Sequence, residues 1–253
     1  MTEPSAGLEQ EETEHDVDRI HECVVKMAKE ISDFMNITPD KQRMDSLMVA
    51  ANIRNLSLLE LFYTCVSNLC KIMNERGTKI PDEQHHYIEK DDYNKCIYHK
   101  RDMDATERTI VVMKDADILI KICDSTGDFD DTSEYQLLIR LLKEHTIIDD
   151  DGSRRLRQKE EVENPSEVLL NPSDPEATFR YKAGGKHLGY VGNIVESVGE
   201  NGSLIIDYDY QPNTYADNQF MKDYLKRKKR FFRWFLFCCR WSIQWRKKLT
   251  FSI

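Results

Sequence analysis

Residues 171–225 read NPSDPEATFRYKAGGKHLGYVGNIVESVGENGSLIIDYDYQPNTYADNQFMKDYL. Within this stretch, residues 187–198 and 203–210 are rich in β-branched and aromatic side chains, which favour β-strands. The polar link between them is Gly-Glu-Asn-Gly, and Asn-Gly in such a link predicts a β-hairpin. Pro212 ends the second strand, and residues 217–225 then predict a helix. A hairpin followed by a helix therefore defines this part of the fold.

The residues before this stretch predict several helices. Between residues 15 and 34, apolar side chains recur at helical spacing and predict one helix with one buried face. These apolar residues are Ile20, Cys23, Val24, Met27, Ile31 and Phe34. Ser57 and Glu60 form a capping-box sequence that predicts a helix over 58–73. Further helices are expected over 104–123 and from about residue 132 onward.

One short apolar run precedes the helical block. Residues 44–53 read MDSLMVAANI, which predicts a buried strand, although a run of this length is also compatible with a helix. The expected order is therefore strand, helical block, β-hairpin and helix. This order places the chain in the α/β (α+β) class.

Charge is distributed unevenly along the 253 residues, whose formal net charge is −9. Residues 226–253 contain ten Lys or Arg, no Asp or Glu, and all three tryptophans. The preceding 225 residues therefore carry 26 basic and 45 acidic side chains, a net charge of −19. This overall balance excludes a uniformly basic nucleic-acid coat protein. Residues 1–13 are acidic with almost no large apolar side chain, which predicts disorder.

The seven cysteines show no paired spacing, which predicts reduced thiols and a cytoplasmic location. Residues 1–15 are acidic and polar, the opposite of a secretory signal. No apolar run approaches the roughly 20 residues that cross a bilayer, so no association with a membrane is expected.

Two parts of the sequence resemble a known family. Residues 43–52 read RMDSLMVAAN, and residues 174–217 contain the motifs D-P-E-A, G-Y-V-G-N and N-T-Y-A-D in that order. Together they resemble the DDE transposases of bacterial insertion sequences. The resemblance implies a partial RNase H-like core over 14–225, with a large helical insertion at about 55–165 and the hairpin at about 187–210. Family members have a DNA-binding region before the first strand, so this chain is expected to be truncated at both ends.

The resemblance also implies a catalytic site. Asp45 matches the first of three carboxylates that hold a pair of Mg²⁺ ions for cutting and rejoining DNA. The second, in an A-D-G-A-Y motif, and the third, a Glu on a later helix, are absent, so the chain is expected to be inactive. Lys182, Lys186 and His187 are candidates for contacts with DNA phosphates, with a solvated loop as the other interpretation. The implied partners are transposon-end DNA and further copies of the transposase.

The basic tail is interpreted as a translation in a shifted reading frame. If one base is skipped in the A-rich run that encodes residues 226–229, every tryptophan must become glycine, because TGG is its only codon. Residues 238–245, CCRWSIQW, then permit V-A-D-G-A-Y-S-G, which restores the missing motif with its Asp at position 240. Residues 226–253 are therefore predicted to be an out-of-frame, non-native tail, with the break within 226–230.

Two other functions are compatible with the tail. A native basic and aromatic tail could make the chain a non-catalytic DNA-binding module, or an inhibitor of intact transposase. Residues 231–241 could instead anchor a peripheral membrane protein.

Two other side-chain groups have ordinary interpretations. Four residues suggest a zinc site, but their spacing fits no closed structural site. The expected interpretation is therefore solvated polar side chains. These residues are His85, His86, Cys96 and His99. Asp207 and Asp209 share one face of a predicted strand, where solvation at the sheet edge is the default expectation.

Overall fold

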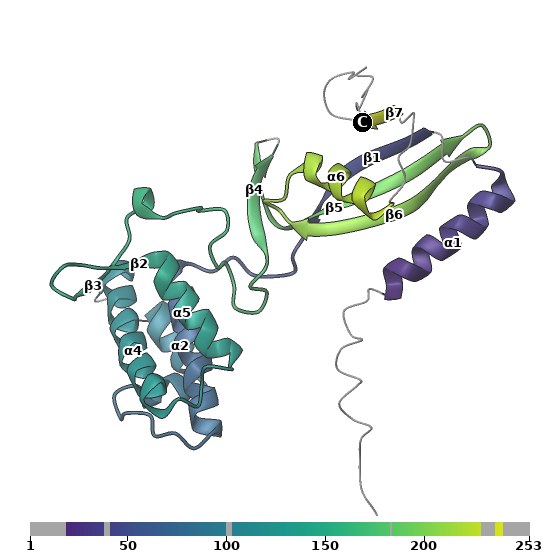
Figure 1. Ribbon diagram of the computed structural model, residues 1–253. Helices are drawn as coiled ribbons and strands as arrows, with labels where there is room; N and C mark the ends of the chain where they lie inside the picture. Colours follow the sequence, from purple (N-terminus) through teal and green to yellow (C-terminus); the bar gives the residue numbers. More distant parts are fainter. Residues whose placement is uncertain (1–18, 38–40, 100–102, 183, 229–235, 240–253) are drawn as a thin grey trace, which may run out of the picture. The chain divides into compact units, whose positions relative to one another are not determined.

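A computed structural model describes residues 19–37, 41–99, 103–182, 184–228 and 236–239. The predicted disordered segment 1–13 and most of the basic tail lie outside these residues. The fold combines helices with a β-sheet (Figure 1), as the sequence predicts. The chain divides into two compact units. The first comprises residues up to 48, 191–211 and those from 215 onward, and the second comprises 49–190 and 212–214.

A five-stranded sheet contains the predicted hairpin. Its strands follow the order β4-β5-β1-β7, and β6 pairs with β5 as well. They are β1 (Lys41–Ala50), β4 (Thr178–Lys182), β5 (Gly185–Gly199), β6 (Gly202–Pro212) and β7 (Leu236–Cys239). β1 runs antiparallel to β5. Ala51 N donates to Leu188 O, and the earlier residue Ser46 accepts from the later residue Asn193, so the two strands run in opposite directions.

The sequence prediction for the sheet was correct in part. The hairpin is confirmed, with longer strands than expected, and the predicted strand at 44–53 lies three residues earlier at 41–50. Two strands were missed. β4 follows the D-P-E-A motif directly and β7 lies within the basic tail, parallel to β1, with Lys41 opposite Leu236 and Met44 opposite Cys239.

The predicted helices are all present, and three of them begin at a side-chain cap. They are α1 (Arg19–Met35), α2 (Leu58–Glu75), α4 (Ala105–Thr126), α5 (Ser133–His145) and α6 (Asp217–Arg227). Ser57 forms the predicted capping box with Glu60, and Asp104 forms a second one with Glu107. Thr132 caps α5 through its side chain.

Shorter elements link the long helices of the second unit. They are η1 (His85–Ile88), α3 (Asp92–Asn94), η2 (Lys95–His99), β2 (Thr146–Ile148), β3 (Arg154–Leu156) and η3 (Lys159–Glu161). β2 and β3 form a separate antiparallel pair.

The main hydrophobic core lies among α2, α4 and α5, which pack side by side (Figure 1). Phe62 and Leu69 of α2, Met113 of α4, and Leu138 and Leu141 of α5 are fully buried. Each such side chain contributes about 1.5–3 kcal/mol through its burial. The helical block is therefore held by a core of its own.

The predicted face of α1 is not buried. Ile20, Met27 and Phe34, on the apolar stripe, are 73%, 53% and 91% exposed, whereas Ala28 on another face is buried. A polar contact from His21 to β6 holds the helix in its own unit. Helical periodicity therefore identified the helix correctly, but the inferred orientation was wrong, because periodicity does not specify which face meets the protein.

Candidate functional site

Asp45 lies on β1 and is half-buried. Its neighbour Met44 is in the core, and Ser46 Oγ accepts a hydrogen bond from Asn193 Nδ2 at 3.0 Å. Asn193, the last residue of the G-Y-V-G-N motif, is only 3% exposed, so this bond ties the motif to β1. Within the described parts of the chain, no hydrogen bond or ion pair engages the Asp45 carboxylate.

The strand beside Asp45 comes from the basic tail. Cys239 is the residue of β7 opposite Met44. Asp45 and Arg240 are the next residues after this pair in the sequence. The tail thus supplies a strand parallel to the one that carries the predicted catalytic carboxylate.

Asp45 is not part of a ready metal cluster. Among the residues that the structure describes, the one group of three His, Cys, Asp or Glu side chains close enough to share an ion lies elsewhere. A Mg²⁺ pair needs several converging hard oxygen ligands, and Asp45 supplies one carboxylate. The described residues around Asp45 therefore do not fit the two-ion site implied by the family resemblance.

The predicted DNA contacts lie on a two-stranded ribbon formed by β4 and the first part of β5, here called the β4–β5 ribbon (residues 178–189). Arg180 is opposite His187, Tyr181 is opposite Lys186, and Lys182 is opposite Gly185. The structure thus brings Lys182, Lys186 and His187 together on neighbouring strands. The ribbon contains no Asp or Glu, so its charge is entirely positive.

Aromatic side chains accompany this charge. The Lys186 ammonium lies 4.2 Å from the centroid of the Phe179 ring, a cation–π distance, and Phe179 contacts Tyr181 edge-on at 5.8 Å. Tyr181 is 72% exposed. Sequence reasoning missed Phe179, Arg180 and Tyr181, although the alternation in T-F-R-Y-K was a readable signal for a half-exposed strand.

A buried asparagine fixes the base of the ribbon. Asn213, in the N-T-Y-A-D motif, is fully buried, and its Nδ2 donates to His187 O at 3.1 Å and to Thr178 O at 3.4 Å. On the ribbon itself, the His187 ring Nε2 lies 3.2 Å from Lys182 O. These contacts hold the two strands together, so the basic side chains project from a fixed backbone.

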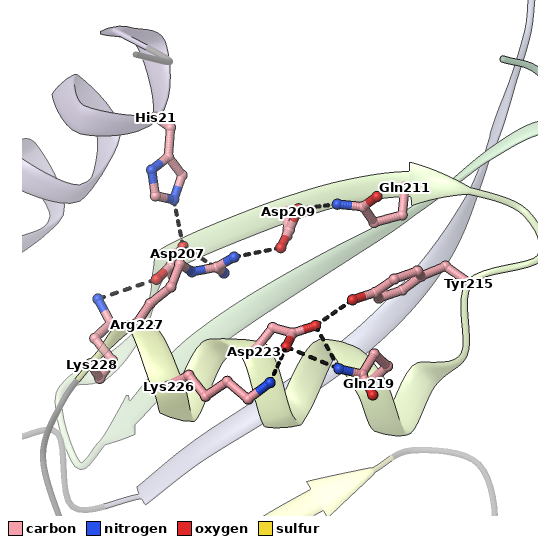
Figure 2. Close-up of polar contacts among 10 residues, drawn as sticks. All are labelled: His21, Asp207, Asp209, Gln211, Tyr215, Gln219, Asp223, Lys226, Arg227 and Lys228. Carbon is pink, nitrogen blue, oxygen red and sulfur yellow. Dashed lines mark hydrogen bonds and ion pairs between the residues drawn. The ribbon is translucent and has the colours of Figure 1, made fainter. Parts of the chain in front are cut away.

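A second polar group connects α1, β6 and the end of α6 (Figure 2). Asp207 is 1% exposed, which corrects the expectation of edge solvation. Its Oδ1 lies 2.6 Å from His21 Nε2, and its Oδ2 lies 3.2 Å from Lys228 Nζ. Arg227 donates to Asp209 at 2.6 Å and approaches Asp207 at 3.8 Å. Asp207 can be buried because side chains from other parts of the sequence neutralise its charge.

Contacts in this network shift the pKa values of nearby groups. Burial and the Asp207 charge raise the pKa of Tyr224 to about 12. Asp223 on α6 accepts from Tyr215 and Gln219, and these bonds lower its pKa. Since each carboxylate in Figure 2 already has a lysine or arginine partner, the network is a structural clamp rather than a metal site.

The histidine and cysteine residues considered for zinc behave differently from one another. His86 and Cys96 converge on Asp92, a residue that the sequence did not single out, whereas His85 and His99 are exposed. The spacing alone did not reveal this convergence, because it depends on how η1 packs beside α3.

No helix in the described residues combines the length and apolar character needed to traverse a bilayer. Comparisons with protein-family models, curated proteins and solved structures find no match to this chain.

Proposed function

We propose that this chain derives from a DDE transposase and binds DNA without cutting it. The observation that carries the proposal is the parallel pairing of β7 with β1. The family resemblance expects the second catalytic Asp on the strand that follows the hairpin and its helix. β7 is the strand that follows β5, β6 and α6, and it pairs with the strand of Asp45.

The position of β7 also supports the interpretation of a shifted frame. Position 240, where the alternative frame places Asp, comes directly after β7, just as Asp45 comes directly after the Met44 pairing. In the frame as translated this position is Arg240. A cation in place of the second carboxylate removes a metal ligand and repels Mg²⁺, which supports the absence of cutting.

The ion-pair clamp narrows the location of the break. Arg227 and Lys228 make specific contacts with Asp209 and Asp207. Contacts of this kind are expected of residues encoded in the native frame. They favour a change of frame after Lys228, at the end of the A-rich run, rather than directly after Leu225.

DNA binding is supported by the β4–β5 ribbon. Lysine side chains neutralise phosphates, and exposed aromatic rings such as Tyr181 provide surfaces on which bases or sugars stack. Lys182, Lys186 and His187 lie on one backbone unit without any acidic neighbour in the ribbon. The ribbon is expected to contact the sugar-phosphate backbone of DNA. Contacts of this kind do not depend on the base sequence.

We expect the Lys182→Ala, Lys186→Ala double variant to bind duplex DNA more weakly and with less dependence on salt. Loss of two phosphate contacts lowers the slope of log K against log[salt] by about 2. Fluorescence anisotropy at several NaCl concentrations measures both quantities. Lys114→Ala with Lys121→Ala removes the same charge from exposed positions on α4 and is the matched control.

The same assay separates the ribbon from the tail. If the ribbon variant binds as the unchanged chain does, whereas Lys247→Ser with Lys248→Ser abolishes binding, the tail is the DNA-binding element and the ribbon assignment is wrong.

We expect no Mg²⁺-dependent nicking of supercoiled plasmid by the purified chain. The physical reason is that Asp45 lacks partner carboxylates in this reading frame. Asp45→Ala is the background control, and gel electrophoresis after prolonged incubation is the measurement. Nicking that Mg²⁺ stimulates and Asp45→Ala removes would show that a complete site forms after all.

A further inference from the structure

Three potential metal ligands, one of them a buried carboxylate, lie together in the helical unit. Asp92 Oδ2 lies 2.7 Å from His86 Nδ1 and 3.4 Å from Cys96 Sγ, and it accepts a hydrogen bond from the Tyr63 hydroxyl at 2.6 Å. The ligand atoms of His86, Asp92 and Cys96 all lie within 4.8 Å of one another. Asp92 is only 5% exposed, whereas the His86 side chain is 34% exposed and open to solvent on one side.

The local fold explains this convergence. Asp92 and Cys96 are four residues apart in the consecutive helical turns of α3 and η2, so their side chains lie on one face. His86 is held by its neighbour Tyr87, which is 2% exposed and donates a 2.7 Å hydrogen bond to Asp115. Each ligand is therefore attached to a backbone that other contacts fix in place.

The Tyr63 hydroxyl holds the carboxylate in a position suited to a cation. It donates to Asp92 Oδ2 at 2.6 Å, and Asp92 is 5% exposed. Tyr63 thus orients the carboxylate, the role played by outer partners in metal sites.

We infer that His86, Asp92 and Cys96 bind one Zn²⁺ ion, or a transition-metal ion of similar softness, with one coordination position left open. On metal binding, the Cys96 thiol releases its proton to solvent, and the neutral His86 ring carries its proton on Nε2, which leaves Nδ1 free to coordinate. The thiolate and carboxylate then balance the 2+ charge. A nitrogen, an oxygen and a sulfur ligand favour zinc over Mg²⁺ or Ca²⁺.

The geometry requires only small side-chain movements. Tetrahedral zinc with bonds of about 2.0–2.3 Å separates its ligand atoms by roughly 3.3–3.6 Å. The present separation of Asp92 from Cys96 is 3.4 Å, and that from His86 is 2.7 Å. Rotation of the partly exposed His86 ring accommodates the difference. This site is separate from Asp45 and does not depend on the proposed transposase origin.

The test is a titration of the full chain with Co²⁺ under reducing, oxygen-free conditions. We expect one equivalent to bind with a thiolate-to-cobalt charge-transfer band, and Zn²⁺ to displace it. Cys96→Ser removes the band, and His86→Gln weakens binding by at least tenfold. Tyr63→Phe keeps all three ligands and weakens binding by about 10–100-fold, as expected for an orienting partner.

Matched controls exist in the same chain. His85→Gln alters the adjacent exposed histidine, Cys23→Ser alters an exposed cysteine on α1, and both leave the band unchanged. Cys238→Ser with Cys239→Ser is also expected to retain it. Circular dichroism of each variant establishes that it is folded. The proposal is overturned if the unchanged chain shows no band, or if the band survives in folded Cys96→Ser but disappears in a control variant.

Discussion

Gly189→Ala is expected to destabilise the protein by about 4 kcal/mol or more, a size reserved for severe backbone or core conflicts. Gly189, the first residue of the G-Y-V-G-N motif, has a φ of +127°, which side chains with a Cβ rarely adopt. A Cβ here would lie closer than 3.0 Å to Ala51 N and to Val49 O, a separation that Cβ atoms in proteins essentially never show. Both neighbours are backbone atoms of the adjoining chain segment, so neither can rotate away.

Urea unfolding followed by circular dichroism measures this effect as a lower midpoint. Gly184→Ala is the matched control, because Gly184 also has a positive φ, +81°, but a Cβ there meets no atom within 4 Å. It should cost about 1–2 kcal/mol from conformation alone. Equal, small shifts for the two variants would mean that β5 does not lie this close to residues 49–51.

Asp207→Ala is expected to cost about 3 kcal/mol. The carboxylate is buried, and its removal leaves His21, Lys228 and Arg227 without the anion that they face. Removing one member of a buried ion pair costs about 3–5 kcal/mol, and the partial exposure of Arg227 and Lys228 places the expectation at the lower end. Asp207→Asn retains the shape and recovers part of the hydrogen bonding, so it should cost less.

Asp209→Ala is the control for this prediction. Its side chain is 20% exposed and meets Arg227 near the surface, so its loss should cost about 1 kcal/mol or less. Thermal and urea unfolding of the three variants measures the order Asp207→Ala, Asp207→Asn, Asp209→Ala. An Asp207→Ala variant as stable as Asp209→Ala would show that the clamp in Figure 2 does not form.

Local sequence was sufficient wherever a structure depends on neighbours a few residues away. Ser57 and Glu60 determine the start of α2 because the capping hydrogen bonds join residues only three positions apart. The polar link around Asn201 marks the hairpin for the same reason. The first strand was also found, with an error of three residues at each end, since apolar runs locate strands better than their ends.

For the candidate site, the sequence predicted individual residues but not the arrangement of side chains around them. Asp45 and the three basic residues of the ribbon could be named from motifs. Their surroundings could not, because the aromatic face formed with Phe179 and Tyr181 depends on the register between β4 and β5. Likewise, the convergence of His86, Asp92 and Cys96 depends on the packing of short helices that have no strong periodic signal.

The amino-acid sequence by itself determined the class of fold, the long helices, the hairpin and the break in composition after residue 225. Tertiary structure alone decided which face of α1 is open, that β7 pairs with β1, and that Asp207 is buried. The physical reason is the distance along the chain between interacting groups. Capping and turn signals act over three or four residues, whereas the His21–Asp207 contact joins positions 186 residues apart. No local pattern contains the partner of such a contact, so burial and charge neutralisation there are properties of the folded chain.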